Sequence, residues 1–226
     1  SVVTPNKELF CKCSHELEKA AKKNNCGLFY EASCVGGVPV IRALLDNLQG
    51  NKVLSMMGII NGTTNYILTK MTDENASYED VLKEAQRLGY AEANPTADVE
   101  GFDAAYKLSI LSSLAFHTKI PFSKIYREGI TRITSADIQY GKQLGYALKL
   151  LAIGKNTDEG IEVRVHPTYI KNTHPLASVK DSYNAVYITG DCVEDVMLYG
   201  RGAGAMPTAS AIVGVVIYCA THPNFR

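Results

Sequence analysis

The stretch SVVTPNKELFCKCSHELEKAAKKNNCGLFY, residues 1–30, decides the fold class. Residues 1–4 are predicted to form a buried strand, and residues 28–30 a second short strand. Between them, residues 8–23 place apolar side chains at helical spacing among lysines and glutamates, and Gly27 suits the left-handed position after a helix. Strand, helix and strand in this order make half of a doubly wound α/β unit.

The rest of the chain alternates helical and strand-like patterns. Helices are predicted over 40–48, from the turn at 61–65 to 71, over 78–88 and over 98–117, and strands over 52–60, 145–154, 161–167 and 184–188. A glycine-rich loop at 200–207 leads into an apolar helix at 209–220, which is too short to span a bilayer and is predicted to be buried. We expect an α/β remnant at 1–30, a larger α+β domain at 31–199 and a returning segment at 200–226.

Composition and charge argue against several classes of protein. The 226 residues carry 23 lysines and arginines against 23 aspartates and glutamates, so no nucleic-acid partner is expected. The printed residues show no signal-peptide pattern and no apolar run of bilayer length, so no membrane is expected either. The six cysteines have neither metal-site nor disulfide-framework spacing, which favours reduced thiols in a cytoplasmic enzyme.

The sharpest chemical pattern is the pair Asp103 and Lys107 in the predicted helix at 98–117. A spacing of four residues puts both on one helix face, about one turn apart. Core-type neighbours would desolvate the ammonium of Lys107 and lower its pKa, while Asp103 would raise it, and such a group can give a proton to a developing alkoxide. The alternative is a surface ion pair worth about 0.3–0.5 kcal/mol, which spacing alone favours.

Two further carboxylates precede this helix. Asp98 lies near its start, where capping the helix is an ordinary role. Glu92 lies in the loop at 89–95 without a comparable structural role, so it is a candidate ligand-binding residue. The glycines at 200–204 open a helix whose free N–H groups can bind an anion. They do not satisfy G-x-G-x-x-G, and a tight turn is an equally good interpretation.

Five runs together resemble the homoserine dehydrogenase family and occur in the family's order. They are VVTPNK (2–7), YEASCVGGVPVI (30–41), GIINGTTNYILTKM (58–71), LGYAEANPTADVEGFDAAYKLSIL (88–111) and GRGAGAMPTASAIVG (200–214). The resemblance implies interconversion of L-aspartate 4-semialdehyde and L-homoserine, with NAD(P)(H), in the pathway to threonine, methionine and isoleucine. A joint match over most of the chain also outweighs the surface-pair interpretation of Asp103 and Lys107.

The resemblance further implies roles for single residues at the substrate. Lys107 would be the general acid/base at the carbonyl oxygen, where charge develops during hydride transfer. Glu92 and Asp103 would bind the amino and hydroxyl groups of homoserine. The substrate-binding positions implied in full are Lys7, Thr63, Tyr90, Glu92, Asp98 and Asp103.

Cofactor and cation positions follow from the same resemblance. Lys7 would lie between nicotinamide and substrate, and Gly89 and Gly204 would contact the cofactor through their backbone. A monovalent cation, expected to be Na⁺, would be held by Glu31 and by main-chain oxygens of Cys34, Gly36 and Val38. Hard oxygen ligands suit such an ion.

The resemblance also implies a mixed sheet with helices largely on one face in 31–199, and a homodimer formed through that domain. Residues 1–30 would be the remnant of a Rossmann-type NAD(P)-binding domain, whose glycine-rich nucleotide loop should lie roughly 100 residues upstream. We therefore expect the back part of a longer protein, inactive by itself. The alternatives are a non-catalytic module for substrate binding or dimerisation, and a related dehydrogenase of another amino-acid semialdehyde.

Overall fold

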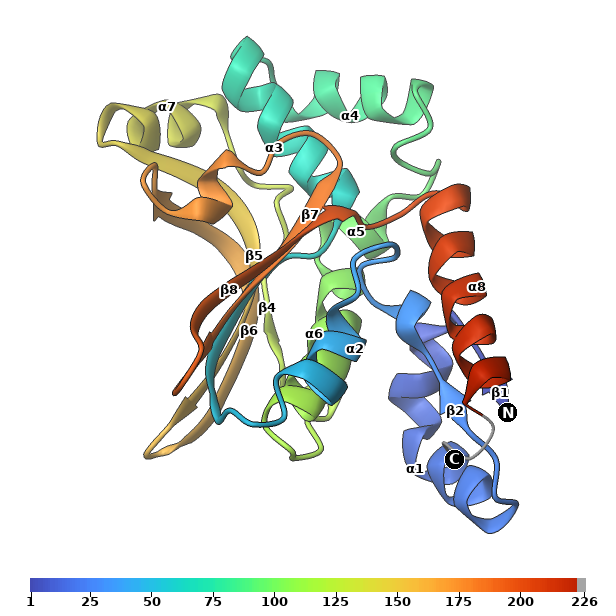
Figure 1. Cartoon of the computed structure of the whole chain (residues 1–226). Helices are drawn as coiled ribbons and strands as arrows, with labels where there is room; N and C mark the ends of the chain where they lie inside the picture. Colours follow the sequence, from blue (N-terminus) through green and yellow to red (C-terminus); the bar gives the residue numbers. More distant parts are fainter. Residues whose placement is uncertain (223–226) are drawn as a thin grey trace.

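The computed structural model describes residues 1–222. Its first part is a parallel two-stranded sheet, β1 (Val2–Val3) beside β2 (Leu28–Phe29), connected by α1 (Lys7–Lys23) (Figure 1). The predicted strand, helix and strand are confirmed. The prediction that the first strand is buried is wrong, because Val2 is 56% exposed. Within residues 1–222, β1 has β2 as its single neighbouring strand, so its outer edge meets solvent.

The turn after α1 differs from the prediction at one position. Asn25, with φ of +50°, takes the left-handed position that we expected for Gly27. The N–H of Asn25 bonds to the carbonyl of Lys22 at 3.2 Å, and that of Cys26 to the carbonyl of Ala21 at 2.9 Å. This is the Schellman arrangement of a helix end, in which asparagine is the usual substitute for glycine.

The second part is built on a six-stranded sheet of order β4-β6-β5-β3-β7-β8. The strands are β3 (Val53–Ile59), β4 (Tyr126–Arg127), β5 (Tyr146–Thr157), β6 (Gly160–Lys171), β7 (Tyr183–Gly190) and β8 (Glu194–Arg201). β4 and β6 are parallel and the other neighbours antiparallel, so the sheet is mixed, as expected. β4 and β8 were not predicted; β8 begins with two acidic residues and contains Gly200, a composition typical of a loop.

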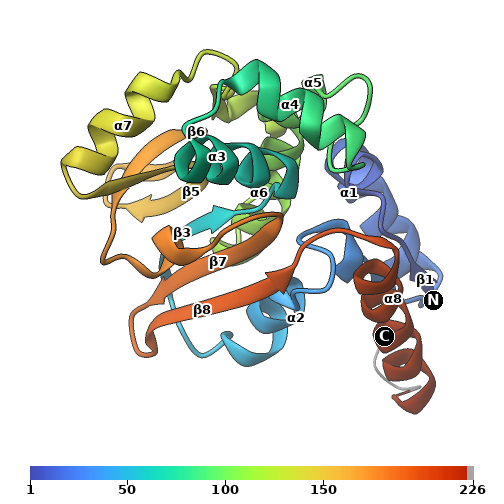
Figure 2. The same ribbon diagram turned by 90° about the horizontal axis from the view of Figure 1, so that it is seen from above.

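Several helices pack beside this sheet, whereas α1 and α8 (Ala205–Thr221) lie apart from it (Figure 2). The other helical segments are η1 (Glu31–Ser33), α2 (Val40–Arg42), η2 (Ala43–Asn47, a π-helical segment), α3 (Gly62–Glu74), α4 (Tyr78–Arg87), α5 (Thr96–Val99), α6 (Phe102–Ala115), η3 (Phe122–Lys124), α7 (Ser135–Gln143) and η4 (Pro175–Ser178). The helices predicted over 40–48, to 71 and over 78–88 are confirmed. α7 was not predicted, although Thr134 and Asp137 form a capping box at its start.

The two faces of the sheet are covered differently. The larger core contains residues from α2, α3, α6 and α7, such as Ile41, Ile67, Leu108 and Ile138. The opposite face is covered by η4 and the residues after it, through Leu176. The helices of this domain therefore gather on one face, as expected.

The predicted helix at 98–117 is two helices. α5 ends at Val99, α6 begins at Phe102, and Gly101 between them has φ of +76°. A Cβ on Gly101 would lie 3.3 Å from side-chain atoms of β4 and of β6. The break was not predicted because the apolar pattern is continuous across it. The break comes from the positive φ of one glycine, which the pattern does not record.

The last helix is more exposed than predicted. α8 packs against η1 and β1, and Val215 is its buried residue. Val213, Val216 and Ile217 are 54%, 50% and 57% exposed, because no element within residues 1–222 covers them. Residues 223–226 of the expected returning segment lie outside the described residues. Among residues 1–222, no helix combines the length and hydropathy needed to cross a membrane.

Candidate active site

Asp103 and Lys107 form a buried ion pair near the start of α6. Lys107 Nζ lies 2.7 Å from Asp103 Oδ2 and also donates to the carbonyl oxygen of Ile60 at 2.8 Å. Each side chain is 11% exposed, so the surface-pair interpretation is wrong. Burial by itself would raise the pKa of Asp103, but Lys107, Lys7 and a hydrogen bond from Asn61 outweigh it and hold that pKa at about 2.

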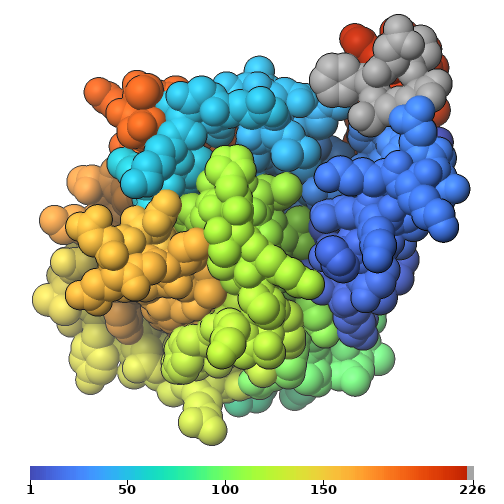
Figure 3. All heavy atoms as spheres, turned by 90° about the horizontal axis from the view of Figure 1, so that it is seen from below, coloured from blue at the N-terminus to red at the C-terminus, as the bar shows by residue number. Residues whose placement is uncertain are grey.

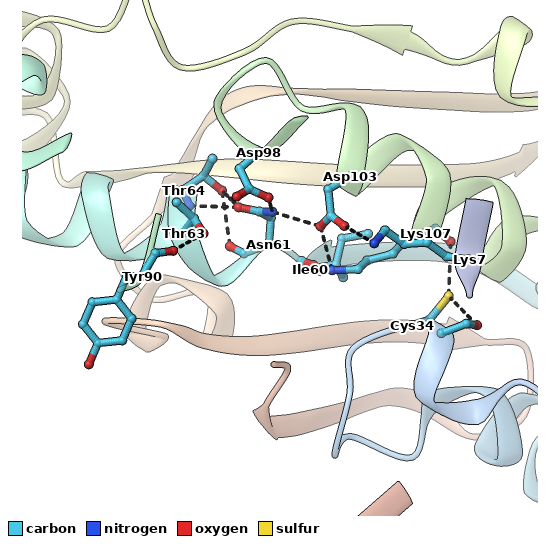
Figure 4. Close-up of polar contacts among 11 residues, drawn as sticks. Lys7, Cys34, Ile60, Asn61, Thr63, Thr64, Tyr90, Asp98, Asp103 and Lys107 are labelled. Atoms are coloured by element: carbon cyan, nitrogen blue, oxygen red, sulfur yellow. Dashed lines mark hydrogen bonds and ion pairs between the residues drawn. The ribbon is translucent and has the colours of Figure 1, made fainter. Parts of the chain in front are cut away.

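Asn61 connects the carboxylates of Asp98 and Asp103 (Figure 4). Its Nδ2 donates to Asp98 Oδ1 at 2.7 Å and to Asp103 Oδ2 at 2.9 Å, while its Oδ1 accepts from the N–H of Thr64 and caps α3. The sequence suggested that Asp98 caps a helix, but its side chain bonds to Asn61 instead. Burial raises the pKa of Asp98. Asn61 was not among the predicted site residues, because its place in the turn between a strand and a helix gave no sign of these two contacts.

Lys7 reaches the site from α1, which packs against α6 (Figure 3). Lys7 Nζ lies 3.1 Å from Asp103 Oδ1, on the other oxygen from the one that Lys107 contacts. Burial lowers the pKa of Lys7, but Asp103 raises it further, so the net shift is upward and the ammonium is retained. One carboxylate thus holds two lysines from the two parts of the chain.

These groups open into a cavity of about 590 Å³. Its lining residues are Pro5, Lys7, Ala32, Ser33, Val35, Gly36, Asn61, Gly62, Thr63, Gly89, Tyr90, Glu92, Asp98, Asp103, Lys107, Ser182, Arg201, Gly202, Ala203, Gly204 and Thr208. Every residue predicted for substrate or nicotinamide contact is among them. Segments far apart in the sequence meet here, which is the arrangement expected of a ligand site.

The main chain of the loop that carries Glu92 is held by hydrogen bonds, whereas the Glu92 side chain is not. Thr63 Oγ1 donates to the carbonyl oxygen of Tyr90 at 2.7 Å, and the Tyr90 ring stacks on Tyr66 with centroids 4.5 Å apart. Gln86 donates to the main-chain oxygen of Glu92 at 3.1 Å. The carboxylate of Glu92 is exposed and makes no hydrogen bond or ion pair within residues 1–222, so it is available to a ligand.

One wall of the cavity is main chain. Gly204 and Gly89 have φ of +116° and +79°, which glycine adopts without strain. A Cβ on Gly36 would lie 2.4 Å from the carbonyl oxygen of Gly202, so the segments that carry these two residues pack backbone to backbone. The printed sequence contains no G-x-G-x-x-G turn for the cofactor's pyrophosphate.

Two of the four expected cation ligands line a second cavity. These are Glu31 and Gly36; the cavity has a volume of about 430 Å³, and its lining does not include Cys34 or Val38. Both oxygens of Glu31 accept N–H groups at the start of α2, at 3.1 and 2.8 Å, and burial raises the pKa of this carboxyl to about 7. The carbonyl oxygen of Val38 accepts from the N–H of Val40 at 2.8 Å. A cation beside Glu31 would offset the cost of burying its charge. The cation site stays a prediction.

Besides Asn61, the polar cavity residues Arg201 and Ser182 were not predicted. Arg201 ends β8 and donates to Ser182 Oγ at 3.2 Å. Neither carried a signal in sequence, because Arg201 was assigned to a glycine-rich loop and Ser182 precedes β7 in an ordinary turn. Their position at the cavity depends on the pairing of β7 with β8.

Comparison with known proteins gives a consistent result. The family model for homoserine dehydrogenase matches residues 39–217. The homoserine dehydrogenase of Bacillus subtilis is 48% identical over 225 residues, which cover 100% of this chain and 52% of that protein. The crystal structure of a homoserine dehydrogenase from Thiobacillus denitrificans has a TM-score of 0.94 at 48% identity, covering 96% of this chain and 50% of that one.

A more distant structure carries a cofactor. A hyperthermophilic archaeal homoserine dehydrogenase in complex with NADPH has a TM-score of 0.84 at 30% identity, covering 97% of this chain and 64% of that one. The chain described here spans about half the length of the curated relatives it matches.

Proposed function

Because the chain belongs to the homoserine dehydrogenase family, we propose that it carries the substrate site and catalytic lysine of an enzyme that interconverts L-homoserine and L-aspartate 4-semialdehyde with NAD(P)(H). The observation that supports this most directly is the buried network of Lys107, Asp103, Asn61, Asp98 and Lys7 at one cavity. Such a network holds a proton donor in a fixed orientation, as catalysis at a carbonyl oxygen requires.

Lys107 is the acid and base of the proposed reaction. Two N–H groups of its ammonium are directed to Asp103 and to the Ile60 carbonyl, which leaves the third for the substrate oxygen. In the direction of reduction that N–H proton passes to the oxygen as negative charge develops on it. In the direction of oxidation Lys107 takes the hydroxyl proton. The bound cofactor, when present, donates or accepts the hydride at the substrate carbon.

The other cavity residues bind and orient the substrate. Glu92 takes the α-ammonium group, for which an exposed and unpaired carboxylate is suited. Asp103 holds Lys107 and Lys7 and contacts the hydroxyl, with Asn61 and Asp98 behind it. Lys7, Gly89 and Gly204 face the nicotinamide side, and Thr63 and Tyr90 hold the loop over the substrate.

Further parts of the proposal concern the whole protein. Glu31, with main-chain oxygens of Cys34, Gly36 and Val38, holds a monovalent cation, Na⁺. The protein is a cytoplasmic homodimer that associates through the domain at 31–199, and its NAD(P) is bound largely by residues that precede those printed.

The test is an assay of the complete natural protein that contains these 226 residues. NADPH consumption with L-aspartate 4-semialdehyde, and NADP⁺ reduction with L-homoserine, should both occur. Turnover of a different amino-acid semialdehyde in preference to this one would identify a related dehydrogenase. Homoserine binding without turnover would indicate a non-catalytic module.

A further inference from the structure

The charged residues of the cavity form an incomplete set of pairs. Six charged side chains line it, namely Lys7, Glu92, Asp98, Asp103, Lys107 and Arg201. Four of them belong to one network, in which Asp103 pairs with both lysines and Asn61 connects Asp98. Glu92 and Arg201 remain, one anion and one cation, and neither has an ion-pair partner among residues 1–222.

The guanidinium of Arg201 is held in place by neutral groups. Its Nη1 donates to Ser182 Oγ at 3.2 Å, and its central carbon lies 4.2 Å from the centroid of the Tyr183 ring. The next residue, Gly202, packs so tightly on buried Asn184 that a Cβ there would lie 1.5 Å from Asn184 Oδ1. The backbone beside Arg201 is therefore constrained, and its head group keeps most of its five N–H donors free.

The proposed substrate has three polar groups, and two of them already have a proposed partner in the cavity. Homoserine is a zwitterion, with an α-ammonium, an α-carboxylate and a distal hydroxyl. Glu92 is assigned to the ammonium and Lys107 to the hydroxyl oxygen. Both lysines already share the charge of Asp103, so Arg201 is the one cation of the cavity whose charge is uncompensated within residues 1–222.

We infer that Arg201 binds the α-carboxylate of the amino-acid substrate and, with Glu92, selects for a zwitterion. This inference rests on the proposed function. A guanidinium presents paired N–H groups that match the two oxygens of a carboxylate, which a lysine ammonium does not reproduce. Arg201 acts on binding and specificity, while the proton transfer at the far end of the substrate belongs to Lys107.

The experiment uses Arg201→Gln and Arg201→Lys in the complete natural protein, with Arg132→Gln as control. Arg132 is exposed and does not line the cavity. Loss of one charge-assisted contact should raise the KM for L-homoserine about 10- to 100-fold in Arg201→Gln, and less in Arg201→Lys. The KM for NADP⁺ should not change, and Arg132→Gln should behave as wild type.

A matched ligand separates carboxylate recognition from a general defect. 3-Amino-1-propanol is homoserine without its carboxylate, so its inhibition constant against L-homoserine should be the same in wild type and in Arg201→Gln. If Arg201→Gln does not fold, as judged by circular dichroism, Arg201→Lys is used for the same comparison.

Three outcomes would overturn the inference. The KM for homoserine could be unchanged in both variants. The binding of 3-amino-1-propanol could be weakened as much as that of homoserine. The KM for NADP⁺ could rise instead, which would assign Arg201 to a cofactor phosphate. These outcomes leave the proposed function intact. A wild-type protein without homoserine turnover would refute the proposed function and this inference together.

Discussion

At the residue scale the site depends on Asp103. Its two oxygens accept from Lys7, Lys107 and Asn61, which come from α1, α6 and the residue before α3. Because these donors outweigh its desolvation, the pKa of Asp103 is about 2 and the carboxylate is ionised at neutral pH. An ionised Asp103 pairs with both lysines and orients them, and a network of this kind is rigid only while every member is satisfied.

The first prediction concerns Lys107. Lys107→Ala in the complete protein should reduce turnover of L-homoserine by about 10²- to 10⁴-fold, because the proton donor is removed. Asp103 would keep Lys7 as its partner, so the fold and the dissociation constant for NADPH should change little. Lys155→Ala, at an exposed position of β5, is the control. Near-normal turnover in Lys107→Ala would show that the lysine is structural.

Lys149 is a buried lysine outside the site. It is 5% exposed and donates to Asn65 Oδ1 at 3.2 Å and to the carbonyl oxygen of Val179 at 2.5 Å. Burial first, and then nearby Lys180, lower its pKa from 10.5 to about 8. Between about pH 8 and 10.5, Lys149 therefore binds more protons in the unfolded chain than in the folded one. The contribution of Lys149 to stability rises with pH in that window.

The second prediction follows from that sign. Between pH 8 and pH 10.5 the free energy of unfolding of wild type should rise relative to Lys149→Met, by a total on the order of 3 kcal/mol. Urea unfolding at several pH values measures the difference in the free energy of unfolding between wild type and Lys149→Met. The titration of groups that the two proteins share cancels in this difference. Lys155→Met, exposed on the same strand, should run parallel to wild type. Parallel curves for Lys149→Met would contradict the lowered pKa.

At the scale of elements, two connections shape the cavity. Gly101 separates α5 from α6 and allows Asp98 and Asp103 to reach Asn61 from two different helices. Gly202 connects β8 to α8 against the side chain of Asn184. In both places the conformation of the turn sets the position of the helix that follows it, and so the position of the side chains that this helix carries.

The third prediction tests the second connection. Gly202→Ala places a methyl group on Asn184 Oδ1, and Asn184 is 1% exposed, so the connection has to move. Overpacking of this kind costs about 1–3 kcal/mol, and we expect a lower Tm together with a higher KM for homoserine. Gly50→Ala is the control, because nothing lies within 4 Å of its Cβ. A stable Gly202→Ala with unchanged KM would show that the Asn184 side chain yields freely.

At the scale of the whole molecule, the site lies where the first 30 residues meet the larger domain. Lys7 comes from the first part, and Asp103 and Lys107 from the second. The outer face of α8 and the edge of β1 are exposed in residues 1–222, and nothing printed offers a pyrophosphate loop. Binding of substrate and turnover should therefore separate when this chain is studied alone.

The fourth prediction states that separation. The 226-residue chain should bind L-homoserine, measured by calorimetry, and should not reduce NADP⁺ with it. The residues proposed to bind the substrate all line the cavity, whereas the printed sequence has no glycine-rich turn of the kind that binds a pyrophosphate. Glu92→Gln should weaken this binding. Turnover by the chain alone would disprove the prediction.

The fifth prediction concerns assembly. On the sheet face that η4 covers in part, Met57, Tyr187 and Met197 are half-buried. Apolar side chains that stay partly exposed are suited to contact with a second copy. Light scattering should give twice the 24.6 kDa mass of one chain. Met197→Glu should shift the mass towards one chain, and Lys83→Glu on α4 should not. A monomeric wild type at micromolar concentration would refute the expected homodimer.

Local patterns allowed much of this molecule to be predicted from its sequence. Periodicity predicts the strand, helix and strand of residues 1–30 and the strands at 52–60 and 145–154, and spacing predicts that Asp103 and Lys107 share one helix face. Each of these depends on neighbours a few residues away. The family match added the remaining site residues. Neither could place Gly101 at a helix break or Asn25 at a left-handed turn, since a single backbone angle leaves the surrounding pattern unchanged.

Only the tertiary structure decided what those residues do together. In the folded chain Asp103 is the shared partner of Lys7, Lys107 and Asn61. Glu92 and Arg201 are the charged cavity residues that have no ion-pair partner within residues 1–222. Charge compensation depends on which groups meet in space, and these groups come from segments up to about 190 residues apart in the chain. Sequence determined which chemical groups exist; packing determined which of them remain available to a ligand.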